Sequence, residues 1–124
     1  MVHRILMVSR GGTVSAMVRA ALVTTQLELE TVGDITALVQ ASLSTPPSMV
    51  IADIGHFGIQ DLSSFDAFSL ELRTIGVPAL LLTPRNAAWL PEATFSQLRK
   101  PFLTQALIEA VYSLIGRSVE PSAL

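Results

Sequence analysis

Polar side chains follow several apolar runs of this sequence, each at the point where the run ends. Asp53 follows Met-Val-Ile-Ala, Thr83 follows Ala-Leu-Leu-Leu, and Ser9-Arg10 follows Ile-Leu-Met-Val. Lys100 lies further along the chain, directly before Pro101. A buried carboxylate next to a cation forms an ion pair. We therefore expect Asp53 to pair with Arg10 or Lys100.

Two other features bear on ligands. The segment Ser9-Arg10-Gly11-Gly12-Thr13 opens a predicted helix, and backbone N–H groups at such a position can hold an anion. His56 lies close to Asp53, but one histidine and one aspartate are too few ligands for a metal site, so no metal site is predicted. The chain has no cysteine, which excludes disulfides, thiolate metal sites and cysteine nucleophiles.

Elements of regular structure must bring these residues together. The alternation and spacing of apolar residues predict strands over 3–8, 27–32, 49–53, 77–83 and 94–99, and helices over 13–22, 35–43, 61–75 and 101–115. Thr13 and Asp34 are expected as helix N-caps and Gly116 as a C-cap. The inward side chains of the later helices are expected to include Leu43, Leu62 and Leu103. Segment 84–93 leaves room for one helical turn at most.

Strands that alternate with helices predict an α/β fold with a parallel sheet covered on both faces. In such a sheet, ligands gather beyond the carboxyl ends of the strands, so the polar residues named above fall at one edge. One domain is expected over residues 1–116, with 117–124 as a tail or the start of a linker.

Composition limits the class of function. Half of the 124 residues are apolar, 15% are charged, and the net charge is −2 with scattered basic residues. These values exclude disorder and give no basic patch for nucleic acid. No apolar run approaches the roughly 18 residues of a membrane span, and the N-terminal run is too short for a signal peptide. We expect a cytoplasmic protein that binds neither nucleic acid nor membrane.

In chain order, Asp53, Thr83 and Lys100-Pro101-Phe102 resemble the receiver domain of bacterial two-component response regulators. The resemblance covers about residues 2–116. It implies a flavodoxin-like, doubly wound, five-stranded parallel sheet. It also implies that Asp53 is equivalent to the phosphoacceptor, and that Thr83 and Lys100 are equivalent to the residues that contact the phosphoryl group.

The sequence departs from the receiver pattern at several positions. Ser9 and Arg10 stand where receivers carry an acid pair that helps to hold Mg²⁺, so no cofactor is expected and Mg²⁺ binding is in doubt. Gln97 stands at the position of an aromatic switch residue. The segment between Thr83 and Lys100 is several residues short, so the fourth helix is expected to be shortened or missing.

The resemblance implies a signalling module rather than an enzyme. We expect an atypical, phosphorylation-independent receiver domain in a phosphorelay pathway, with a histidine kinase, an output protein or a second copy of the chain as partner. One alternative is a conventional receiver with Asp53 as phosphoacceptor. Another is a flavodoxin-like module that binds flavin or an anion through the Ser9–Thr13 loop.

Overall fold

The computed structural model describes residues 3–9, 12–23, 25, 27–54, 62–84 and 95–119, with side chains described up to Gly116. The strands are β1 (His3–Val8), β2 (Leu27–Val32), β3 (Met49–Asp53), β4 (Ala79–Thr83) and β5 (Ser96–Arg99). Within the same ranges the helices are α1 (Thr13–Leu22), α2 (Ile35–Ser44), α3 (Leu62–Ile75) and α4 (Thr104–Val119). Every predicted strand is therefore present.

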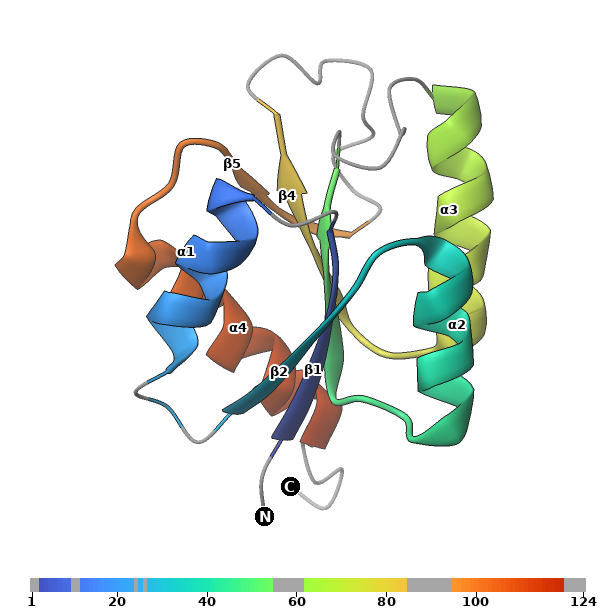
Figure 1. The fold of residues 1–124 in the computed structure, drawn as a ribbon, viewed down its shortest axis with the longest axis horizontal. Coiled ribbons are helices and arrows are strands. Elements are labelled where there is room, and N and C mark those ends of the chain that lie inside the picture. The colour runs from blue at the N-terminus through green and yellow to red at the C-terminus, as the bar shows by residue number, and fades with distance from the viewer. Residues whose placement is uncertain are drawn as a thin grey trace.

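The five strands form one parallel sheet in the order β2-β1-β3-β4-β5. Helices α1 and α4 cover one face, and α2 and α3 cover the other (Figure 1). The chain winds outward from β1 to β2 and then returns across the sheet through β3, β4 and β5. The strand order thus reverses between β1 and β3, which is where ligand sites form in doubly wound sheets. The predicted α/β fold is confirmed.

The central strands are buried on both faces because their apolar runs are continuous. Every residue of β3 and of β4 is buried, and so are the last four residues of β1. Strand β2 alternates between half-buried and exposed residues, as expected at a sheet edge. Two hydrophobic clusters result, one on each face of the sheet. Phe65, Phe68 and Leu72 of α3 fill one cluster, and Leu107 and Val111 of α4 help to fill the other.

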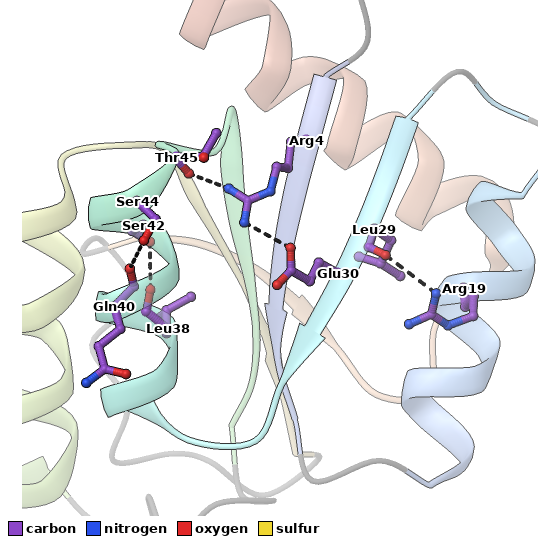
Figure 2. Close-up of polar contacts among 9 residues, drawn as sticks. All are labelled: Arg4, Arg19, Leu29, Glu30, Leu38, Gln40, Ser42, Ser44 and Thr45. Atoms are coloured by element: carbon purple, nitrogen blue, oxygen red, sulfur yellow. Dashed lines mark hydrogen bonds and ion pairs between the residues drawn. The ribbon is translucent and has the colours of Figure 1, made fainter.

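Arginine side chains contact the strands at the β2 edge of the sheet. Arg4 of β1 forms an ion pair with Glu30 at 2.9 Å and donates to the carbonyl of Thr45, the residue after α2 (Figure 2). Arg19 of α1 donates to the carbonyl of Leu29 and to the Thr31 hydroxyl. Charged side chains on an edge strand hinder pairing with strands of other molecules.

Helix boundaries follow local sequence signals in two places. Asp34 is the N-cap of α2, and its Oδ1 accepts a hydrogen bond of 2.8 Å from the Ala37 N–H, as predicted. The helix ends at Ser44, one residue beyond the predicted end and just before Pro46-Pro47. Within α2, the buried Ser42 hydroxyl donates to the Leu38 carbonyl one turn earlier (Figure 2), which satisfies it without a tertiary partner.

Two predicted caps are wrong. The N-cap of α1 is Gly12 rather than Thr13, and its φ of 90° favours glycine. Gly116 does not end α4, because the helix continues through Val119, three residues into the segment predicted as a tail. A glycine inside a helix costs about 1 kcal/mol, which is too little to end a helix held by packing.

Three leucines predicted to face the core are exposed instead. Leu43 lies five residues after the buried Leu38, about 140° around the helix axis, and therefore points away from the sheet. Leu62 is the first residue of α3. Leu103 precedes α4, which begins at Thr104 rather than at Pro101. Apolar periodicity identifies a helix, but it does not determine how the helix is rotated on the sheet or at which residue the helix begins and ends.

The predicted short fourth helix falls on residues 84–93, of which only Pro84 is described. It stays a prediction. Among the described residues, no helix combines the length and the apolar composition that crossing a membrane requires.

Candidate functional site

Asp53 is the last residue of β3 and is completely buried, with 0% of its surface exposed. The strand places it there because the Ile54 N–H bonds to the Leu82 carbonyl of β4 at 2.9 Å, which extends the parallel ladder past the strand end. A buried carboxylate is costly unless cations or hydrogen-bond donors surround it. The position therefore requires a partner from elsewhere in the chain.

Lys100 supplies such a partner. Its Nζ donates to Asp53 Oδ1 across 47 residues of sequence, and the lysine side chain is 23% exposed. The backbone places Lys100 at the strand end, because its N–H bonds to the Thr83 carbonyl at 2.9 Å. The following Lys100–Pro101 peptide bond is cis. The ion pair expected between Lys100 and Asp53 is thus present.

Thr83 and Ser9 lie at the ends of the strands on either side of Asp53. Both residues are almost fully buried, at 3% and 2% exposure. Thr83 joins the site through its main-chain carbonyl, which holds the Lys100 backbone. The Ser9 N–H bonds to the Val32 carbonyl at 2.9 Å, which continues the β1–β2 ladder. The four strand ends therefore meet at one edge, as the sequence predicted.

The donors at this edge do not match a hard divalent cation. The described residues contribute one carboxylate, already paired with an ammonium, and the hydroxyls of Ser9 and Thr83. Mg²⁺ and Ca²⁺ bind roughly six or more oxygen atoms, usually with several carboxylates. Within the described ranges, no three His, Asp or Glu side chains lie close enough to hold a metal ion.

Arg10 and His56, two residues of the predicted site, lie outside the described residues. The pairing of Arg10 with Asp53 therefore stays a prediction. Gly12 is described, and no side chain caps the helix that follows it. Gln97 lies in the middle of β5 and is half-buried.

A hollow that no sequence signal indicated lies beside the ion pair. It has a volume of about 490 Å³ and lies between α1 and the connection from β5 to α4. Its described lining residues are Val14, Met17, Pro84, Lys100, Pro101 and Phe102. Val14 and Met17 have the spacing of core residues, and nothing in that spacing shows that they also border an open surface.

No protein-family model and no curated protein matches the chain. Solved structures do match. A protein described as a response regulator from Chloroflexus aurantiacus superposes with a TM-score of 0.76 at 24% identity, over 94% of this chain and 100% of that one. The receiver domain of a LuxO repressor protein from Vibrio parahaemolyticus gives a TM-score of 0.76 at 16% identity, over 95% and 93%. The chain has the receiver-domain fold.

A CheY-like receiver domain protein from Methanospirillum hungatei agrees, with a TM-score of 0.73 at 18% identity over 93% of this chain and 95% of that one. NtrX from Brucella abortus is longer, and the receiver-like chain spans 28% of it at 19% identity, with a TM-score of 0.75. The receiver-like chain is less than 25% identical to each of these proteins, so the likeness establishes the fold alone.

Proposed function

We propose that this chain is an atypical receiver domain that takes part in two-component signalling through protein–protein contacts and without phosphorylation of Asp53. The observation that carries the proposal is that Asp53 is the one carboxylate that the described residues bring to this edge, and it is paired with Lys100 rather than grouped with further acids. In a phosphoacceptor site, a metal ion must offset the charge of the aspartate and of the incoming phosphoryl group. Here an ammonium already offsets the aspartate, and the resemblance to receivers assigns Ser9-Arg10 to the positions of the acid pair.

The receiver-domain fold supports a signalling role. The proposed partners are a histidine kinase, an output protein or a second copy of the chain. The output of the domain is then a change in contacts rather than a chemical product.

Phosphorylation tests this proposal directly. The protein is incubated with acetyl phosphate and Mg²⁺, and its intact mass is measured, with Asp53→Asn as the matched control and a conventional receiver domain as the positive control. We expect no phosphoryl adduct on the wild type. The double variant Ser9→Asp/Arg10→Asp restores the acid pair and is expected to gain an adduct that the same variant with Asp53→Asn does not form.

A conventional phosphoacceptor is the second candidate. It is favoured by the adjacent positions of Asp53, Thr83 and Lys100 at the ends of β3, β4 and β5. A phosphoryl adduct on the wild type that disappears in Asp53→Asn would establish this candidate and refute the first.

A further inference from the structure

The hollow beside the ion pair has the size and the lining of a small-molecule site. Its volume is about 490 Å³, and ligand pockets in proteins typically measure about 300–1,000 Å³ with mostly apolar walls. Val14 and Met17 of α1 form one side, and Pro101 and Phe102 form the other. Val14, Met17 and Phe102 are half-buried, and Val14 and Phe102 also pack against the hydrophobic core.

Lys100 gives the hollow its polarity. Among the described lining residues, Lys100 carries a charge and the other five are apolar. Asp53 is absent from that described lining, is fully buried, and is reached by the lysine ammonium. A molecule in the hollow therefore meets the lysine stem and ammonium before it meets the carboxylate.

The ammonium has bonding capacity for a ligand. A lysine ammonium carries three N–H donors, and one of them bonds to Asp53 Oδ1. Since 23% of the side chain is exposed and Lys100 lines the hollow, an acceptor group in the hollow can approach the lysine side chain. A carboxylate or sulfonate forms a charge-assisted hydrogen bond with the ammonium, which is stronger than the hydrogen bond that a neutral acceptor would form.

We propose that this hollow binds a small amphiphilic anion, with its apolar part against Val14, Met17 and Phe102 and its anionic group on Lys100. Such a ligand bonds to the same ammonium as Asp53, and its negative charge repels the Asp53 carboxylate. Occupancy of the hollow and the strength of the Lys100–Asp53 pair are then linked through one side chain. The inference does not depend on whether Asp53 accepts a phosphoryl group, and its test uses no phosphodonor.

Two fluorescent probes test the proposal. 8-Anilinonaphthalene-1-sulfonate carries an anionic group, and N-phenyl-1-naphthylamine has the same ring system without it. The wild type is expected to bind the sulfonate saturably at one site. Met17→Glu places a like charge in the wall and is expected to weaken sulfonate binding at least about ten-fold. Leu43→Glu, on the exposed surface of α2, is the matched control and is expected to leave it unchanged.

The role of Lys100 is tested in the Asp53→Asn background, because there its removal leaves no buried carboxylate without a cation. Asp53→Asn alone is expected to bind the sulfonate about three-fold more tightly than the wild type, because the negative charge of the carboxylate no longer repels the anion. Asp53→Asn/Lys100→Met is expected to bind it about ten-fold more weakly than Asp53→Asn. Binding of the neutral probe is expected to be equal in these two variants. Circular dichroism confirms that each variant is folded.

Three results would overturn the proposal. The first is the absence of saturable sulfonate binding to the wild type. The second is equal binding by Met17→Glu and Leu43→Glu, which places the probe elsewhere. The third is an equal loss of both probes on removal of Lys100. That loss would make the hollow a purely apolar groove, suited to an apolar segment of a partner protein.

Discussion

The substitution Lys100→Met measures how much the buried ion pair contributes to the free energy of unfolding. The substitution keeps the length and apolar character of the side chain and removes its charge. Breaking a buried pair by removing one partner costs about 3–5 kcal/mol, because the other charge stays buried without compensation. Asp53 is 0% exposed and Lys100 is 23% exposed. Water therefore screens one end, and we expect a loss near the lower limit, about 3 kcal/mol.

Urea unfolding followed by circular dichroism measures this loss. With a slope of about 1.5 kcal/mol per M for a domain of this size, the midpoint is expected to fall by roughly 2 M. Asp53→Asn is expected to cost about 1 kcal/mol, because the lysine that remains can reach water. The double variant is expected to cost about 2 kcal/mol, since neither charge is left uncompensated. The coupling energy between the two positions is then about 2 kcal/mol.

The ion pair between Arg4 and Glu30 provides the matched control. Its side chains are 24% and 53% exposed, and solvent-exposed pairs contribute at most about 1 kcal/mol. The same cycle with Arg4→Met and Glu30→Gln is therefore expected to give a coupling energy below that of the buried pair. Losses that add within about 0.5 kcal/mol in the Lys100–Asp53 cycle would refute the reasoning.

Three further variants test the packing and the helix ends by the same urea measurement. Asp34→Ala removes the N-cap of α2 and is expected to lower the free energy of unfolding by about 1 kcal/mol. Asp66→Ala, on the exposed side of α3, is the control and is expected to leave the free energy of unfolding nearly unchanged. Equal losses in the two variants would contradict the capping role. Phe65→Ala removes a ring that is 1% exposed and packs edge-to-face on Phe95, with 6.5 Å between the ring centroids. The free energy of unfolding is expected to fall by about 3–5 kcal/mol. A fall of less than about 2 kcal/mol would contradict the place of Phe65 in the core. Gly116→Ala is expected to raise stability by about 0.5–1 kcal/mol, because a Cβ there meets nothing within 4 Å and the position is helical; a decrease would show that α4 ends before it.

Much of the fold could be predicted because its signals are local. A continuous apolar run such as the one before Asp53 fits a strand buried on both faces, and β3 is fully buried. Asp34 caps a helix through its own side chain and the next turn of backbone, so its role needs no tertiary contact. Leu43 and Leu103 are exposed, against the prediction, because the burial of a residue at a helix end depends on how the helix packs on the sheet.

The candidate site, too, could be predicted in part from the sequence and in part only from the tertiary structure. The sequence alone predicted that polar residues end the apolar strands and that parallel strands bring them to one edge. It left open whether Arg10 or Lys100 pairs with Asp53, and it gave no sign of the hollow. The tertiary structure pairs Lys100 with Asp53, because β4 lies between β3 and β5 and fixes the register of both.

The sequence by itself therefore determined which segments are buried and where each strand ends, since apolar periodicity records burial. Only the tertiary structure decided which strands are neighbours, and so which side chains from distant segments touch. The contact between Lys100 and Asp53 joins residues 47 positions apart, and the hollow beside it combines α1 with the connection from β5 to α4. Contacts of this kind depend on strand order and register, which the periodicity of a single segment does not contain.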